Sequence, residues 1–313
     1  MAYKPEIGMN VTAADINVFI VPATIIFMMT PIGLIGNGLV LASVFLSAKL
    51  RTKTNVFIVS LALTDLLNCV FFPVQALSLL SENGSNLGLQ HLCATSAAIV
   101  IFTVIASINN MALIAVNRWI KITRSSTTYS RIYSRRNMFF MILVSWTIPV
   151  CIFTVPQLTG TGQLGYSSSF KVCLWKDDTV SYEYMITTMA VPSFIAAVTF
   201  LGTYIDIGLF IWKRKHRLQQ SRAKEIMVTK TVGIIVCMFF LCIVAFAICV
   251  TIRLDPIPLT FSSVLVLASS IVNPFVYAFK QSIFRQTFLC VIKCHFGDVP
   301  DPSRELRNLL RRR

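Results

Sequence analysis

The chain alternates between long apolar runs and short polar segments. Seven apolar runs reach or exceed the ~20 residues that an α-helix needs to cross the ~30 Å of hydrocarbon in a bilayer. They cover residues 17–46, 55–80, 92–120, 138–158, 183–212, 227–252 and 259–280. The pattern therefore predicts an all-α membrane protein, a bundle of seven transmembrane helices over residues 17–280.

The composition agrees with a membrane protein. Hydrophobic residues make up 55% of the chain, charged residues 13%, and the mean hydropathy is +0.72. Soluble domains carry about 25% charged residues. A large soluble helical protein with a wide core is the alternative, but such a protein has no reason to sort its charges by alternate loops.

The basic residues are sorted in this way. All but four of the 28 Lys and Arg residues lie in four regions, which are Lys49–Lys53, Arg118–Arg136, Lys213–Lys230 and the tail from Lys280 onward. Basic loops stay on the cytoplasmic side of a membrane. This places residues 1–16 outside a plasma membrane and residues 281–313 inside. The net charge of +15 abuts helix ends, where it meets anionic lipid or an intracellular partner, so we expect no nucleic-acid binding.

The predicted outer segments carry two glycosylation sequons, at Asn10 and Asn83. Met1–Val18 lacks the basic start and apolar core of a cleavable signal peptide, so we expect the first span to target the chain to the membrane.

The nine cysteines sort by location. Five lie inside apolar runs, where free Cys is usually a small buried hydrophobe. Cys290 and Cys294 follow the last run on the basic side and are candidates for palmitoylation. Cys93 and Cys173 lie on the predicted outer side, which is oxidising, so we expect a disulfide between them. No Cys or His set has zinc spacing.

Polar residues inside apolar runs are costly and need a reason. Six of the runs carry a distinctive polar or Pro mark at a particular depth, and the mark differs from run to run. The marks are Gly36-Asn37, Asp65 within Leu61–Asp65, Ser107 with Asn109-Asn110 and Asn117-Arg118-Trp119, Trp146 with Pro149, Pro192, and Asn273-Pro274-Phe275-Val276-Tyr277.

As an ordered set, these marks resemble those of the class A, rhodopsin-like G-protein-coupled receptors. The resemblance covers all seven runs and implies a short amphipathic eighth helix at Gln281–Phe288. Within the family, Asn117-Arg118-Trp119 and Ile132–Asn137 are most similar to the melatonin-receptor group. The resemblance implies a receptor for an extracellular small-molecule or peptide ligand, not an enzyme, acting through a heterotrimeric G protein of the inhibitory class.

The residues expected to line a ligand pocket depart from that group. They are Val100, Ile101, Val104, Trp175 and Asp177. The melatonin receptors have Phe and Gln where Trp175 and Asp177 stand, so a neutral indole would meet a carboxylate, which disfavours melatonin. Amine receptors have Asp where Val100 stands, and opsins have the retinal-binding Lys where this chain has Leu267. The sixth run also lacks the family's Trp and Pro, at Cys242–Ala245.

The resemblance implies functions for the buried polar residues. Asp65 has two interpretations: a sodium site with Ser107, Ser269 and Asn273, since hard cations prefer oxygen ligands, or a neutral carboxyl bonded to Asn37 and Asn273. No other cofactor is expected. G-protein coupling and switching are assigned to Asn117, Arg118, Trp119, Glu225, Asn273, Pro274 and Tyr277, with Glu225 pairing with Arg118.

Other interpretations remain open. Arg118 is also compatible with an ordinary Arg extending from a helix end. A seven-span channel or transporter would need ionisable residues along a path through several runs, and only Asp65 and Asp206 lie at such depths. The altered sixth run also fits a receptor-like partner that dimerises without signalling. The sequence does not identify the ligand or the oligomeric state.

Overall fold

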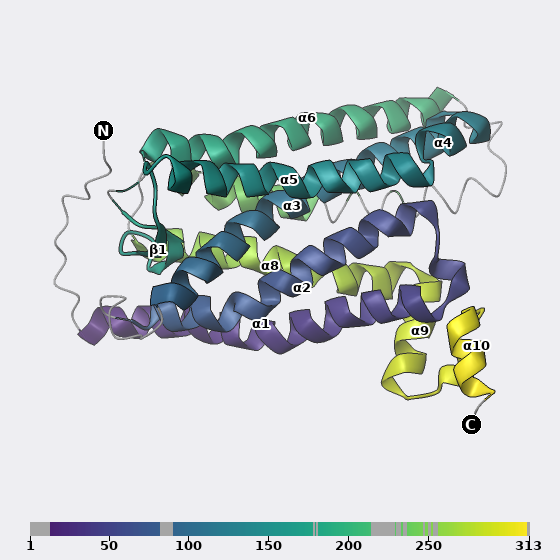
Figure 1. The fold of residues 1–313 in the computed structure, drawn as a ribbon, viewed down its shortest axis with the longest axis horizontal. Coiled ribbons are helices and arrows are strands. Elements are labelled where there is room, and N and C mark those ends of the chain that lie inside the picture. Colours follow the sequence, from purple (N-terminus) through teal and green to yellow (C-terminus); the bar gives the residue numbers. More distant parts are fainter. Residues whose placement is uncertain are drawn as a thin grey trace.

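The computed structural model describes residues 13–81, 90–177, 179, 181–213, 229, 233, 237–246, 248–249, 252 and 256–311. Its long helices lie side by side along one axis (Figure 1). They are α1 (Ala13–Leu46), α2 (Lys53–Leu79), α3 (Gln90–Thr123), α5 (Arg135–Leu158), α6 (Tyr182–Lys213) and α8 (Pro256–Lys280). Each of these six is long and apolar enough to cross a membrane, and the described helical stretch Cys237–Phe246 belongs to the sixth predicted run.

Two of the long helices, α2 and α5, begin at polar residues that cap them. The Thr52 hydroxyl accepts a hydrogen bond from the Asn55 amide at 3.3 Å, and the Ser134 hydroxyl accepts one from the Asn137 amide at the same distance. Such caps satisfy amides that have no partner within the helix. The six long helices match their predicted runs closely, with small extensions into the flanking polar segments.

The centre of the bundle is α3, which packs against α2, α5 and α6. Close packing elsewhere needs small residues. A Cβ atom on Gly36 would lie 3.0 Å from the Cβ of Pro274, so this glycine allows α1 to approach α8. The tryptophan of the fourth run joins two helices, because Trp146 Nε1 donates to Ser60 Oγ at 2.9 Å.

One end of the bundle, called here the hairpin end, carries two short antiparallel strands that the sequence did not predict. β1 (Leu164–Ser167) pairs with β2 (Val172–Trp175), with Tyr166 opposite Cys173. The two strands pack against α3 (Figure 1). They bring the segment between the fourth and fifth runs back over the bundle.

The other end, called here the basic end, carries the short helices α4 (Ser126–Ile132), α9 (Ser282–Ile292) and α10 (Arg304–Leu310) (Figure 1). Short 3₁₀ turns lie at η1 (Ala48–Leu50) and η3 (Phe296–Asp298). The predicted eighth helix is confirmed as α9, which continues past the predicted end. It is anchored because the buried ring of Phe284 stacks on Tyr277, with 5.5 Å between ring centroids.

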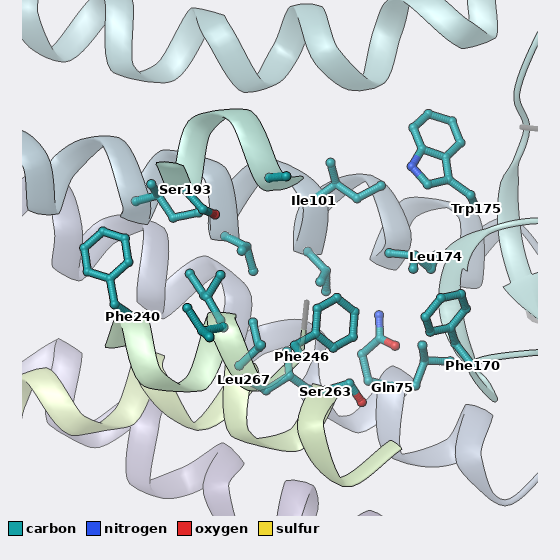
Figure 2. A pocket seen from close by; sticks show the side chains of 18 of the residues that line it. Gln75, Ile101, Phe170, Leu174, Trp175, Ser193, Phe240, Phe246, Ser263 and Leu267 are labelled. Carbon is teal, nitrogen blue, oxygen red and sulfur yellow. The ribbon is translucent and has the colours of Figure 1, made fainter. Parts of the chain in front are cut away.

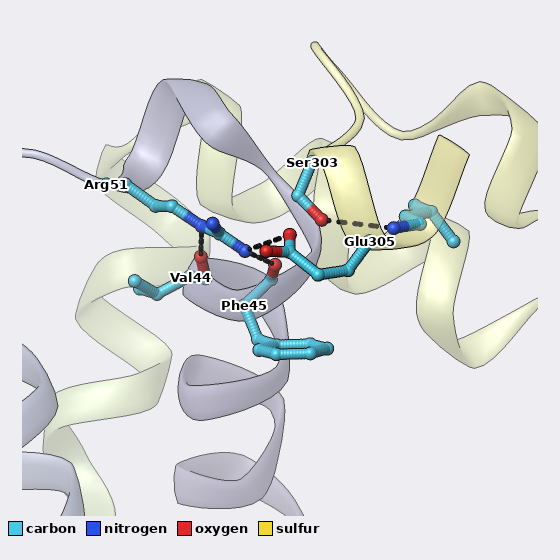
Figure 3. A network of polar contacts seen from close by, with 6 residues as sticks. Val44, Phe45, Arg51, Ser303 and Glu305 are labelled. Atoms are coloured by element: carbon cyan, nitrogen blue, oxygen red, sulfur yellow. Dashed lines mark hydrogen bonds and ion pairs between the residues drawn. The ribbon is translucent and has the colours of Figure 1, made fainter. Parts of the chain in front are cut away.

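The C-terminal segment folds back onto the turn after α1. The Ser303 amide donates to the Leu46 carbonyl at 2.7 Å, and the Ala48 amide donates to the Asp301 carbonyl at 2.9 Å. Arg51 forms an ion pair with Glu305, with 2.9 Å between Nη2 and Oε2. Figure 3 shows this contact and the Phe45 carbonyl that also accepts from Arg51.

Candidate functional site

A cavity of about 390 Å³ lies toward the hairpin end of the bundle (Figure 2). Its walls come from α2, α3, α6, α8, the helical stretch Cys237–Phe246 and the hairpin. Four of the predicted pocket residues line it: Val100, Ile101, Val104 and Trp175. Its size lies within the range of small-molecule sites.

The lining of this cavity is almost entirely apolar. None of the described lining residues is charged, and the polar ones are Gln75, Ser193 and Ser263. Gln75 is already engaged, because its amide nitrogen donates to Ser96 Oγ at 2.9 Å and to the Cys173 carbonyl at 3.1 Å. Its carbonyl accepts from the Cys173 amide at 3.0 Å. Gln75 therefore clamps the hairpin to α2.

Asp177 is not among the lining residues, so its predicted place in the pocket is wrong. Its carboxylate accepts hydrogen bonds from Ser167 Oγ at 2.7 Å, from Ser168 at 2.6 Å and from the Ser169 amide at 3.1 Å. Asp177 thus pins the hairpin turn. Burial, and then the nearby Asp177 charge, raises the pKa of Tyr166 to about 12.

The predicted disulfide is confirmed. Cys93 and Cys173 are bonded, with 5.2 Å between their Cα atoms, and the bond joins the start of α3 to β2. The two candidate palmitoylation sites lie after α8, where Cys290 is half-buried and Cys294 is exposed.

A buried polar cluster surrounds Asp65 in the middle of the bundle. Ser107 Oγ donates to Asp65 Oδ1 at 3.1 Å, and Asn273 Nδ2 donates to Asp65 Oδ2 at 2.7 Å. Asp65 is 1% exposed, and these partners come from α3 and α8. The structure therefore joins three helices at one carboxylate.

The predicted fourth member, Ser269, does not join this cluster through its hydroxyl. Its Oγ donates to the Val266 carbonyl of its own helix at 2.6 Å. The neighbouring Ser270 faces Asp65 instead, and its Oγ also accepts from Asn68 Nδ2 at 3.1 Å. Successive helical residues point about 100° apart. The sequence motif alone did not identify which serine faces inward.

The cluster fits a hard monovalent cation. The side-chain carbonyl oxygens of Asn68 and Asn273 are buried without a hydrogen-bond partner, whereas the predicted bond from Asn37 to Asp65 is not formed, because the Asn37 amide donates to the Gly33 and Ser270 carbonyls. Such oxygens, together with a carboxylate and a hydroxyl, are the donors that hard cations prefer. Among the described residues, no group of three His, Cys, Asp or Glu side chains could hold a metal ion.

The second cluster lies at the basic end of α3. Thr54 Oγ1 donates to Asn117 Oδ1 at 2.9 Å, and Asn117 Nδ2 donates to the Tyr129 hydroxyl at 3.3 Å. Asn117 therefore ties α3 to α2 and α4. Its neighbour Arg118 is only 4% exposed and interacts electrostatically with Tyr204 and with Tyr277 of the Pro274–Tyr277 motif.

Trp119 makes a contact that the sequence analysis missed. Its indole nitrogen donates to Asp206 of α6, and Arg124 lies over its ring at 5.4 Å from the centroid. The isolated acid among the apolar residues of α6 was the signal. Glu225, Asn10 and Asn83 lie outside the described residues.

Comparison with known proteins gives one consistent family. The sequence profile described as "7 transmembrane receptor (rhodopsin family)" matches residues 36–277. The chain is 30% identical to melatonin receptor type 1C of Gallus gallus, over 72% of this chain and 64% of that protein. It is 31% identical to melatonin receptor type 1A of Mus musculus, over 72% and 62%. The matched region thus spans slightly less than two thirds of these relatives.

A longer match is to melatonin receptor type 1A of Ovis aries, at 26% identity over 88% of this chain and 80% of that receptor. Among solved structures, squid rhodopsin superimposes with a TM-score of 0.75 over 89% of this chain and 87% of that chain. At 21% identity, this similarity concerns the fold, which is a seven-helix bundle.

Proposed function

The chain belongs to the rhodopsin family of seven-transmembrane receptors, and from this premise we propose that it binds an extracellular ligand and activates a heterotrimeric G protein. It is a membrane-spanning signalling receptor rather than an enzyme. The observation that carries the proposal is the placement of the cavity and Arg118. They occupy opposite ends of one bundle, and the Asp65 cluster lies between them.

The proposed orientation follows from the sorted basic residues. Residues 1–16 lie outside the plasma membrane, residues 17–280 form the transmembrane domain, and residues 281–313 form α9 and the cytoplasmic tail. Asn10 and Asn83 are then candidate glycosylation sites, and Cys290 and Cys294 candidate palmitoylation sites.

The proposed mechanism is a shift between two populations of the bundle. A ligand shifts them only by its difference in affinity for the two states. Arg118 is 4% exposed, so a partner cannot reach it in this arrangement. We expect ligand binding to favour a state in which this end opens and Arg118 meets the G protein's C-terminal helix, as in other helix-in-groove complexes. Relatedness to melatonin receptors supports the inhibitory class of G protein.

We also propose that the Asp65 cluster binds sodium. Asp65, Ser107 and Asn273 would hold the ion, with Ser270 in place of Ser269. A bound cation supplies positive charge beside a carboxylate that is otherwise buried among neutral groups. Its presence would favour the arrangement in which α2, α3 and α8 meet at Asp65.

The ligand itself is proposed to differ from melatonin. The described cavity residues present no free side-chain amide, because the Gln75 amide is engaged by Ser96 and Cys173.

The test is a G-protein dissociation assay in cells that express the chain with an inhibitory-class G protein. We expect dissociation above the level of cells without the receptor, and Arg118→Ala should abolish it at equal surface expression. No dissociation with any G-protein class, basal or across a ligand library, would support a non-signalling partner. An ionic current carried by the purified chain would support a channel.

A further inference from the structure

The roof of the cavity is closed at the hairpin end. Phe170, Val172 and Trp175 line the cavity from above and are 6%, 7% and 3% exposed. The Cys93 disulfide and the Gln75 hydrogen bonds hold the hairpin down. Phe170 also meets Phe246, with 6.3 Å between ring centroids (Figure 2). A ligand arriving from water on this side would have to displace a pinned hairpin.

The side of the cavity is thinner than its roof. Phe194 of α6 and Val244 of the stretch Cys237–Phe246 both line the cavity, yet they are 70% and 49% exposed on the outside of the bundle. The face of α6 that lines the cavity also carries three small residues at helical spacing, Ala190, Ser193 and Ala197. Only one layer of side chains separates the cavity from the surface that faces the bilayer.

The chemistry of the walls limits what can bind. An ionised group bound here would lose its hydration and would find no opposite charge among the described lining residues. Hydroxyls are tolerated, since Ser263 Oγ donates to the Thr260 carbonyl at 2.7 Å and retains acceptor capacity. The walls therefore favour an uncharged, mainly apolar molecule with at most a hydroxyl or similar group.

We propose that the ligand is a neutral, lipid-soluble molecule that reaches the cavity from the bilayer, passing between α6 and the stretch Cys237–Phe246. This inference rests on the proposed receptor function and names its ligand class and access route. Phe194 and Val244 form the rim of the opening. The hairpin stays closed while the ligand passes.

The first experiment uses binding alone and needs no G protein. The purified chain in nanodiscs is incubated with a photoreactive long-chain alcohol, or with the matched photoreactive fatty acid and fatty amine, and labelled peptides are identified by mass spectrometry. We expect the alcohol to label cavity residues such as Val104 and Leu267, and the two charged probes to leave them unlabelled. Labelling of the cavity by a charged probe, or failure of the alcohol, overturns the ligand class.

The second experiment tests the route. Val244→Trp should obstruct the opening and slow both association and dissociation of the alcohol by about tenfold. Leu241→Trp is the matched control, because Leu241 is 69% exposed on the same helical stretch and does not line the cavity. Equal rates in the wild type and both variants overturn the route, as does faster association in Phe170→Ala.

The two proposals fail separately. Binding of the alcohol without any G-protein dissociation leaves this inference standing and removes the proposed coupling. Basal G-protein dissociation, abolished by Arg118→Ala, in a chain whose cavity binds no neutral probe leaves the receptor function standing and removes this inference.

Discussion

The indole nitrogen of Trp119 donates a hydrogen bond to the carboxylate of Asp206, and so joins α3 to α6 at the basic end of the bundle. The two residues are 87 positions apart in the sequence. Two residues earlier on α6, the Tyr204 hydroxyl donates to the Thr229 carbonyl at 2.9 Å. Both contacts hold α6 in the closed arrangement around Arg118.

Removing this hydrogen bond should favour the open state. A partly exposed hydrogen bond of this kind contributes about 1 kcal/mol, and that amount changes a minor population about fivefold. We expect Asp206→Ala to raise basal G-protein dissociation severalfold at equal surface expression. Thr199→Ala is the control, because Thr199 lies on α6 and donates only within its own helix, to Ile195. Unchanged basal signalling in Asp206→Ala would show that the contact persists in both states.

A second contact that favours the closed state is predicted at Glu225, which lies outside the described residues. Glu225→Ala should raise basal signalling by a similar factor if its carboxylate pairs with Arg118, since a partly exposed pair contributes about 0–1 kcal/mol. Basal signalling of the double variant with Asp206→Ala, compared with each single variant, shows whether the two contacts act independently. Additive effects indicate independent contacts, and an effect no greater than that of Asp206→Ala alone rules out a separate contact made by Glu225.

The disulfide prediction concerns stability and the roof of the cavity. The Cys93–Cys173 bond joins residues 80 positions apart, and closing such a loop contributes about 4 kcal/mol in the chain-entropy description. Cys173→Ser should lower the Tm in detergent and reduce surface expression. Cys151→Ser should change neither, because Cys151 is a free, exposed cysteine on α5. Equal Tm values for the two variants would contradict the prediction.

The sodium prediction gives a different expected effect for variants at Asp65, Ser270 and Ser269. Asp65→Asn should abolish any effect of sodium, relative to a larger monovalent cation, on ligand affinity, because the site loses its formal charge. Ser270→Ala should weaken that effect, and Ser269→Ala should leave it intact, since its hydroxyl bonds the Val266 carbonyl. Wild-type affinity that is the same in both cations would favour a purely structural cluster.

The sequence predicted the helices and much of the polar core, for physical reasons that apply to each. Helix lengths follow from the thickness of hydrocarbon, so the runs and the helices coincide. Buried polar residues in hydrocarbon need partners, so Asp65, Ser107 and Asn273 could be expected to meet, and they do.

The remaining features depend on information that local patterns do not carry. Ser269 and Ser270 are neighbours on one helix and point in different directions, and the sequence pattern did not show which of them faces Asp65. The role of Asp177 depended on the hairpin, whose four-residue strands are too short to leave a periodic signal. The contact of Trp119 with Asp206 depends on how α3 and α6 pack, which no single run specifies.

The last prediction concerns the docking of the C-terminal segment and its dependence on pH. The hydrogen bond from Arg51 holds the pKa of Glu305 at about 2, below its ordinary value of 4.5. Because the pKa is lowered in the docked state, the contribution of Glu305 is present above about pH 4.5 and is lost as the pH falls toward 2. The segment should therefore be docked at neutral pH and loosen only in acid.

A spin label at Leu309→Cys, in a background without the other exposed cysteines, measures this docking, because Leu309 is 60% exposed on α10. We expect the label to become more mobile between pH 4.5 and 2. Glu305→Gln should be more mobile than the wild type at pH 7 and lose the acid transition. Arg51→Ala should be more mobile still, since Arg51 also donates to the Phe45 carbonyl at 2.6 Å. An acid transition that survives in Glu305→Gln would assign it to another group.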